Sequence, residues 1–140
     1  IHSMVEYVDG AIIAQLGVPD MRIPIAYALT YPERLPLDVP KVNLGAIGAL
    51  TFAEPDCEKF PCLHYAYQAG AVGGTMPAVL NAANEVAVEA FLREQIAFGD
   101  IPRTVQAMME NHRVKPLVSL DDAIAADQWA RSAAHKFIGF

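Results

Sequence analysis

The sequence predicts an α+β fragment made of a β-hairpin, an extended connector and a C-terminal antiparallel α-helical bundle. Asp9-Gly10 lies between two β-prone runs, which is the strongest short-range signal for a hairpin. Seven of the ten prolines fall between positions 19 and 61, and apolar residues beyond position 61 recur at helical spacing. We therefore expect three parts, residues 1–30, 31–56 and 57–140.

The composition is that of one ordinary globular domain. The chain has 140 residues, 54% of them hydrophobic, with 10 Lys and Arg against 16 Asp and Glu. This acidic balance argues against nucleic acid as a partner, because counterion release needs clustered Lys and Arg. No apolar run approaches the roughly 20 residues that cross a bilayer, so we expect no membrane partner. Cys57 and Cys62 are too few for a disulfide scaffold and are expected to be free thiols in a reducing compartment.

Residues 1–17 form the expected hairpin. Alternation along its first strand puts Ile1, Ser3, Val5 and Tyr7 on one face and His2, Met4, Glu6 and Val8 on the other. Two strands alone are marginally stable in water, so we expect the hairpin to belong to a larger sheet whose other strands lie elsewhere. Because the chain also begins with Ile1 rather than Met, we expect it to be excised from a longer protein.

The proline-rich middle of the chain is expected to be a connector. Pro24 suits the first turn of a short helix, from Pro24 to Tyr31, because its missing N–H would have no partner there. Pro32 would end that helix. From Tyr31 to Lys41 no hydrophobic period is sustained, and the segment 49–52 predicts a short strand.

Four helices are expected beyond position 61. They are residues 61–69, a helix from Met76 to Arg93 with Thr75 as N-cap, a third opened by Asp100 and Pro102, and a last one begun by a capping box of Ser119 and Asp122. Two of them carry apolar stripes, namely Val79, Leu80, Ala83, Val86, Ala87, Ala90 and Phe91, and Ala123, Ala126, Trp129, Ala130, Ala133, Ala134 and Phe137. Short connections favour antiparallel neighbours, so these helices predict a small bundle.

The glycine-rich segment 70–75 precedes a helix N-terminus, where free N–H groups attract anions. No strand precedes it, and it lacks the Lys of a phosphate-binding loop. A flexible interhelical turn is therefore the favoured interpretation, and a phosphate cradle is the competing one.

Asn81, Glu85 and Val88 share the helix face opposite the apolar stripe. These three residues carry little charge for a solvated face. The face is therefore either a second contact surface or simply exposed to solvent. The contact surface would suit an alternative function, a free-standing helical interaction module that docks on a partner protein. His64, His112 and His135 have no nearby Cys or His, and we expect structural or surface roles for them and no metal site.

His2 and the turn of residues 17–21 are the strongest candidates for a functional site. A histidine on a strand presents a titratable ring on a rigid element. Gly17 and Pro19 predict a tight turn that projects Met21, whose soft thioether can lie against a flat ring. On spacing alone, however, filling of a core is the favoured interpretation of Met21, and contact with a flat ring is the alternative.

Six segments of this sequence are informative together, and they cover nearly the whole chain: residues 1–7, 14–17, 19–25, 49–52, 60–63 and 80–85. In this order they resemble the successive signatures of one enzyme family, 1-deoxy-D-xylulose 5-phosphate reductoisomerase. The resemblance implies an enzyme dependent on NADPH and a divalent metal (Mg²⁺, Mn²⁺ or Co²⁺). Such an enzyme converts 1-deoxy-D-xylulose 5-phosphate to 2-C-methyl-D-erythritol 4-phosphate in isoprenoid precursor synthesis.

The resemblance also implies roles for individual residues and parts. His2 matches an active-site histidine near the substrate and metal, and Met21 matches the methionine that lies against the nicotinamide. Pro19 and Asp20 would shape that turn. Residues 1–30 would be the end of a catalytic α/β domain, residues 31–56 the connector and residues 57–140 the helical bundle.

What the resemblance places elsewhere is equally specific. The family's nucleotide-binding loop, its acidic metal ligands and the Ser, Asn and Lys that hold the substrate phosphate would all precede Ile1. The chain alone is therefore expected to be inactive, with the remainder of the same enzyme and the sugar phosphate as its partners. The family resemblance further implies a homodimer, located in the cytoplasm or, in a plastid-bearing organism, in the plastid stroma.

Overall fold

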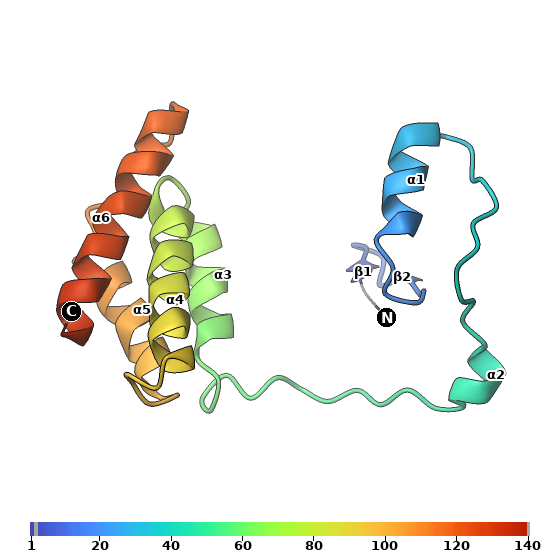
Figure 1. Cartoon of the computed structure of the whole chain (residues 1–140), viewed down its shortest axis with the longest axis horizontal. Coiled ribbons are helices and arrows are strands. Elements are labelled where there is room, and N and C mark those ends of the chain that lie inside the picture. Colours follow the sequence, from blue (N-terminus) through green and yellow to red (C-terminus); the bar gives the residue numbers. More distant parts are fainter. Residues whose placement is uncertain (2, 140) are drawn as a thin grey trace. The chain divides into compact units, whose positions relative to one another are not determined.

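The computed structural model describes residues 1 and 3–139, and it divides the chain into two compact units, Ile1–Ala53 and Glu54–Phe140. The chain is mostly helical with one two-stranded antiparallel sheet, so the expected α+β class is confirmed (Figure 1). Within the described residues, no helix is both long enough and apolar enough to cross a membrane.

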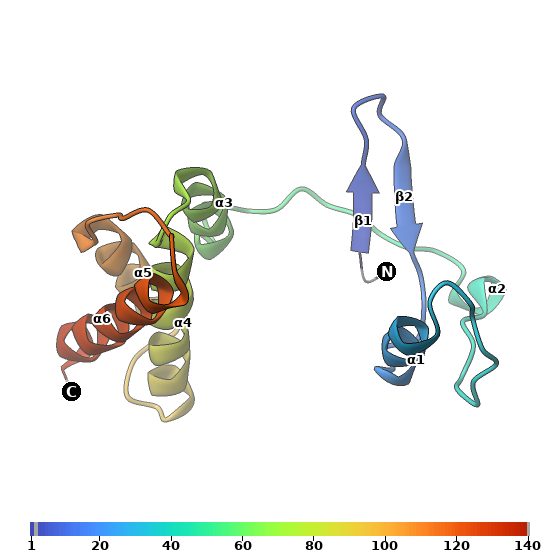
Figure 2. The same cartoon turned by 90° about the horizontal axis from the view of Figure 1, so that it is seen from above.

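The first unit opens with an antiparallel strand pair, β1 (Ser3–Glu6) and β2 (Ile12–Gln15) (Figure 2). The Gly10 N–H donates to the Tyr7 carbonyl at 2.9 Å, and the Tyr7 N–H donates to the Ala11 carbonyl at 2.9 Å. Gly10 has a φ of 85°, whereas Val8 and Asp9 have negative φ. The connection is therefore a turn centred on Val8 and Asp9 and followed by a glycine bulge, one residue out of step with a turn centred on Asp9-Gly10.

Helix α1 (Arg22–Thr30) begins two residues before the expected start at Pro24, and a four-residue helix α2 (Leu44–Ile47) follows in the connector. The Asn43 side chain accepts the Ala46 N–H at 3.1 Å, a cap that sequence analysis overlooked. The expected strand at 49–52 is wrong. A strand needs a hydrogen-bonding neighbour, and β1 and β2, the strands among the described residues, pair with each other.

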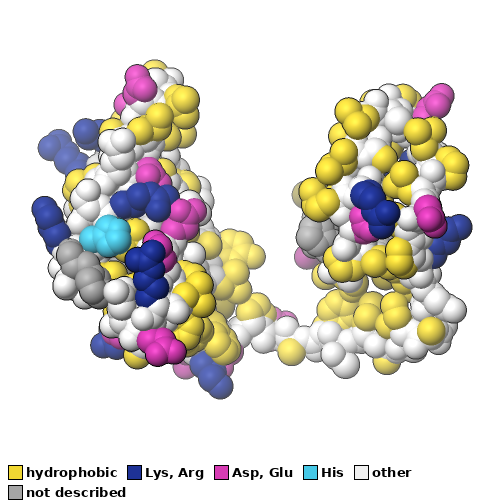
Figure 3. Space-filling model, in the orientation of Figure 1, with side chains coloured by type: hydrophobic (Ala, Val, Ile, Leu, Met, Phe, Trp, Pro, Cys, Tyr) yellow, Lys and Arg dark blue, Asp and Glu magenta, His cyan; other side chains and the backbone are white. Residues whose placement is uncertain are grey.

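No described residue of the first unit is buried. Ile12, Ile13 and Leu29 are each more than half exposed, at 62%, 63% and 82%. The space-filling view shows hydrophobic side chains spread over this unit's surface (Figure 3). The unit has local backbone structure but lacks a core of its own.

The second unit is the helical bundle. It consists of α3 (Cys62–Val72), α4 (Met76–Leu92), α5 (Asp100–Asn111) and α6 (Leu120–Ile138). Helices α3 and α4 run in opposite directions, and α4 packs against all three other helices (Figure 1). Helix α3 continues three residues beyond its expected end at Ala69, and α4 ends one residue before the expected Arg93.

Small side chains make the core of the bundle. Its fully or nearly fully buried members are Val79, Ala82, Ala83, Val86, Val105, Met108, Ala126, Ala130 and Ala134. The large members of the expected stripes lie at the edge instead, with Trp129 and Phe137 exposed at 37% and 54%. Alanine allows α4 and α6 to approach closely, and that close approach leaves no room for larger side chains between them.

The capping box that begins α6 is confirmed. The Ser119 hydroxyl accepts the Asp122 N–H at 3.3 Å, and the Asp122 carboxylate accepts the Ser119 N–H at 2.8 Å. Hydrogen bonds from Ser119 and Val118 lower the pKa of the Asp122 carboxyl, because they favour its charged form.

Candidate functional site

The candidate turn, Gly17–Met21, connects the end of β2 to the start of α1. Ser3 pairs with Gln15, so the start of β1 lies beside the strand end that leads into this turn. His2, the other candidate, lies outside the described residues. Ser3, which follows His2 in the sequence, therefore lies beside Gln15, two residues before the turn begins at Gly17.

Met21 occupies the residue before the first turn of α1 with helical φ and ψ, and its side chain makes no capping bond. Met21 is 70% exposed, so core filling, the interpretation that spacing alone favoured, is wrong for this unit. Pro19 is exposed beside it, and Asp20 is half-buried. The thioether side chain of Met21 is thus exposed to solvent on a short, hydrogen-bonded turn.

Asp20 and Arg22 form a two-pronged ion pair around Met21. The Asp20 Oδ1 accepts the Arg22 backbone N–H at 2.9 Å and the Arg22 Nε at 3.0 Å, and Oδ2 accepts Nη2 at 2.6 Å. These bonds hold the pKa of the Asp20 carboxyl at about 2 and raise that of the Arg22 guanidinium. The pair therefore stays ionised throughout the neutral pH range.

Arg22 is the residue that sequence analysis missed at this site. Its Nη1 also donates to the Asp38 carbonyl at 3.3 Å, which links the turn to the connector. The available signal was the spacing of an acidic and a basic residue, Asp20 and Arg22, at the start of an expected helix.

The glycine-rich segment before α4 is a tight turn packed against the α5–α6 loop. Gly73 and Gly74 both have positive φ, and a Cβ on Gly74 would collide with the Lys115 carbonyl oxygen. The Thr75 N–H donates to that same carbonyl at 3.0 Å. The expected interhelical turn is therefore confirmed, and an N–H donor that a phosphate would need is already used.

Thr75 stands where an N-cap was expected, but its side chain does not cap α4. Its buried hydroxyl lies 2.7 Å from the His112 Nε2 and accepts the Lys115 N–H at 3.1 Å. The His112 ring packs on Trp129 with ring centroids 4.9 Å apart. The pKa of His112 is lowered, mainly because burial disfavours the charged ring and secondly because of the nearby charge of Lys115.

The polar face of α4 is tied to α6. Asn81 donates to the Glu85 Oε1 at 3.0 Å, and Arg131 donates to the Glu85 Oε2 at 2.6 Å and to Asp127 at 2.8 Å. Arg131 and then Asn81 lower the pKa of the Glu85 carboxyl. This face therefore has a role inside the bundle, an outcome that sequence analysis had not considered for Asn81 and Glu85.

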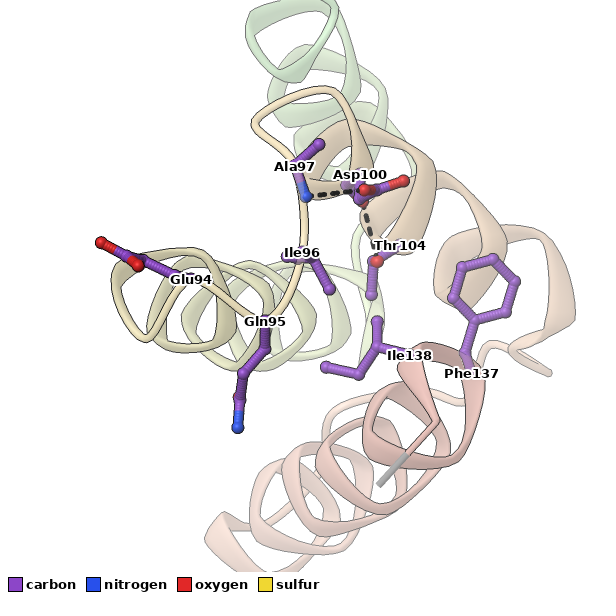
Figure 4. Close-up of a pocket in the computed structure, with 8 residues that line it drawn as sticks. All are labelled: Glu94, Gln95, Ile96, Ala97, Asp100, Thr104, Phe137 and Ile138. Carbon is purple, nitrogen blue, oxygen red and sulfur yellow. Dashed lines mark hydrogen bonds between the residues drawn. The ribbon is translucent and has the colours of Figure 1, made fainter.

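A hollow of about 630 Å³ lies between the α4–α5 turn and the end of α6 (Figure 4). The Asp100 carboxylate accepts the Ala97 N–H at 2.8 Å, and the Thr104 hydroxyl donates to the Asp100 carbonyl at 2.8 Å. Glu94 points away from the hollow (Figure 4). The Asp100 and Thr104 side chains of the hollow are thus already bonded within the bundle, and we assign the hollow no ligand.

The described residues contain no group of three His, Cys, Asp or Glu side chains that could hold a metal ion. Cys57 and Cys62 are free thiols, and burial raises the pKa of the Cys62 thiol. The turn Gly17–Met21 therefore stays the candidate site. It offers the exposed, apolar side chain of Met21 and no group that reacts by itself.

The family model for the DXP reductoisomerase C-terminal domain matches residues 16–133. The chain belongs to this family. It is 56% identical over 138 residues to the 1-deoxy-D-xylulose 5-phosphate reductoisomerase of Pelotomaculum thermopropionicum, a match that covers 99% of the chain and 36% of that relative. The chain thus spans little more than a third of the length of the curated relatives that it matches.

Solved structures of the family share the fold. The chain superimposes with a TM-score of 0.90 on the reductoisomerase from Zymomonas mobilis in complex with NADPH, at 41% identity over 100% of this chain and 37% of that one. A second reductoisomerase structure, with NADPH, fosmidomycin and magnesium, gives a TM-score of 0.85 at 41% identity over 98% of this chain and 36% of that one. The recognition of the family from the sequence motifs is therefore confirmed.

Proposed function

We propose that this chain is the C-terminal part of an NADPH- and divalent-metal-dependent reductoisomerase. The whole enzyme would convert 1-deoxy-D-xylulose 5-phosphate to 2-C-methyl-D-erythritol 4-phosphate in isoprenoid precursor synthesis. The observation that carries this proposal is the 56% identity to a reductoisomerase over 99% of the chain. That match includes the exposed turn Gly17–Met21, whose geometry suits a planar cofactor ring.

The turn is proposed to hold the nicotinamide of NADPH. When bound, NADPH supplies a hydride for the reduction of the rearranged substrate. Met21 covers one face of the ring with its thioether and excludes water from it. Pro19 and Asp20 set the course of the backbone that presents Met21, and His2 acts near the substrate and metal.

The other parts of the catalytic site are proposed to come from the remainder of the same enzyme. The described residues hold no set of side chains that fits a divalent cation, so we derive no metal-dependent step from this chain. Without metal ligands and a nucleotide-binding loop, the chain alone is inactive. The enzyme is proposed to act in the cytoplasm, or in the plastid stroma of a plastid-bearing organism.

The first unit is proposed to complete a larger body. Residues 1–30 are the end of a catalytic α/β domain, followed by a connector at 31–56 and the bundle at 57–140. Support comes from the exposed apolar residues of the first unit and from the free outer edges of β1 and β2. Those edges also suit sheet extension in a homodimer, which light scattering of the intact enzyme would detect.

A fusion protein tests the proposed function. It joins the part of the Pelotomaculum thermopropionicum enzyme that precedes the match to this whole chain, and NADPH oxidation is measured with substrate and Mg²⁺ or Mn²⁺. We expect turnover by the fusion and none above background by the chain alone. A folded fusion without activity would overturn the proposed function, and turnover by the isolated chain would overturn its proposed dependence on the remainder.

A further inference from the structure

The side chain of Met21 has little around it to determine where it points. It is 70% exposed, and it lies in a unit without a buried core. Its direction therefore depends on the backbone of the turn. The bonds that hold the residues immediately before and after Met21 decide that backbone.

Those two residues are joined to each other across Met21. The Asp20 carboxylate accepts the Arg22 backbone N–H at 2.9 Å, the Arg22 Nε at 3.0 and 3.1 Å, and Nη2 at 2.6 Å. The ring of bonds encloses the Met21 backbone. The Met21 carbonyl accepts the Ile25 N–H at 3.2 Å, which anchors the same residue to α1.

Arg22 also connects this arrangement to the connector. Its Nη1 donates to the Asp38 carbonyl at 3.3 Å, so one guanidinium links the turn to the segment after α1. The Arg22 side chain is itself 63% exposed. Exposed ion pairs add little to global stability, so the main consequence of this one is local geometry.

We propose that Arg22 is a positioning residue that fixes the turn on both sides of Met21 and thereby sets how the thioether meets the nicotinamide ring. The inference rests on the proposed function and adds to it a residue that does not itself touch the cofactor. A guanidinium is needed because its planar fork satisfies both carboxylate oxygens and a carbonyl at once. An ammonium group in the same place offers a point charge without that fixed geometry.

The test uses the active fusion enzyme and four variants: Arg22→Gln, Arg22→Lys, Met21→Ala and the double variant Met21→Ala with Arg22→Gln. We expect Arg22→Gln to lower kcat/KM for NADPH about tenfold, because misplacing a positioning group is costly. Arg22→Lys should lose nearly as much, and both variants should keep the KM for the sugar phosphate. In the Met21→Ala background, Arg22→Gln should cause no further loss.

The matched control is Arg93→Gln. Arg93 forms an exposed ion pair with Glu89 on α4, at side-chain exposures of 66% and 57%, far along the chain from the turn. It should leave all kinetic constants unchanged. Circular dichroism and melting temperature establish that each variant is folded, and Arg22→Lys keeps the charge if Arg22→Gln fails to fold.

The outcomes separate this inference from the proposed function. If Met21→Ala leaves kcat/KM for NADPH unchanged, the proposed role of Met21 is wrong and this inference fails with it. If Met21→Ala lowers it but Arg22→Gln does not, or if the two losses simply multiply in the double variant, only the inference about Arg22 is wrong. A rise in the KM for the sugar phosphate equal to that for NADPH would also overturn it.

Discussion

Replacing Thr75 by valine would test how the α3–α4 turn is joined to the α5–α6 loop. The Thr75 hydroxyl accepts the Lys115 N–H and lies 2.7 Å from the His112 Nε2. The described residues offer the hydroxyl proton no acceptor other than that nitrogen. We therefore assign the hydroxyl as donor to Nε2, which makes His112 neutral, with its proton on Nδ1.

The expected cost follows from these two bonds. Thr75 is only 2% exposed, so valine would leave the Lys115 N–H facing a methyl group with no replacement partner. An unsatisfied buried polar group costs about 1–3 kcal/mol. The His112 ring is only partly buried and can recover a bond from water, so it adds little. We expect Thr75→Val to lower the free energy of unfolding by about 2 kcal/mol.

Urea unfolding of the whole chain gives the measurement. Trp129 is the only tryptophan in the chain and packs on His112, so its fluorescence reports on this region. Thr104→Val is the matched control, because Thr104 is 0% exposed but its hydroxyl donates only to the Asp100 carbonyl of its own helix. Equal losses for the two variants would refute our account of Thr75.

Two further predictions concern the same region. Because the folded state lowers the pKa of His112 below its ordinary value of 6.5, the unfolded chain binds more protons as the pH falls through 6.5. Stability should therefore be full above that pH and decline below it, and His112→Gln should remove this part of the decline in urea unfolding; an unchanged slope would contradict the assignment. Gly74→Ala should cost at least about 2 kcal/mol, from positive φ and the collision with the Lys115 carbonyl. Gly70→Ala, which meets nothing within 4 Å, should instead stabilise α3 by about 0.5–1 kcal/mol; similar melting temperatures for the two variants would contradict this.

Local signals predicted most of the elements. The Asp9-Gly10 pair marks the hairpin connection, and Ser119 with Asp122 marks the start of α6, because each depends on residues at most a few positions apart. The first residues of the helices were predicted less accurately. Arg22 begins α1 before Pro24, since proline is tolerated anywhere in the first turn.

Long-range pairs were beyond the reach of sequence reasoning. Thr75 looked like a helix cap, but its hydroxyl bonds His112 and Lys115, which are 37 and 40 positions away. Glu85 looked like part of an outer contact surface or of a solvated face, but it pairs with Arg131 from another helix. At the candidate site the sequence motif indicated Pro19, Asp20 and Met21. The role of Arg22 was inferred only from the hydrogen bonds that it makes in the structure.

The sequence by itself determined the order of the hairpin and the five longer helices, the apolar faces of the helices and the family, because these depend on residue spacing along one chain. Only the tertiary structure decided which polar groups are used up inside the bundle and which remain exposed on the turn. A hydroxyl or carboxylate in the bundle takes whichever partner the packing brings within hydrogen-bond distance. That distance depends on how the helices approach one another. The small side chains of α4 and α6 permit a close approach, but they do not determine which polar groups meet.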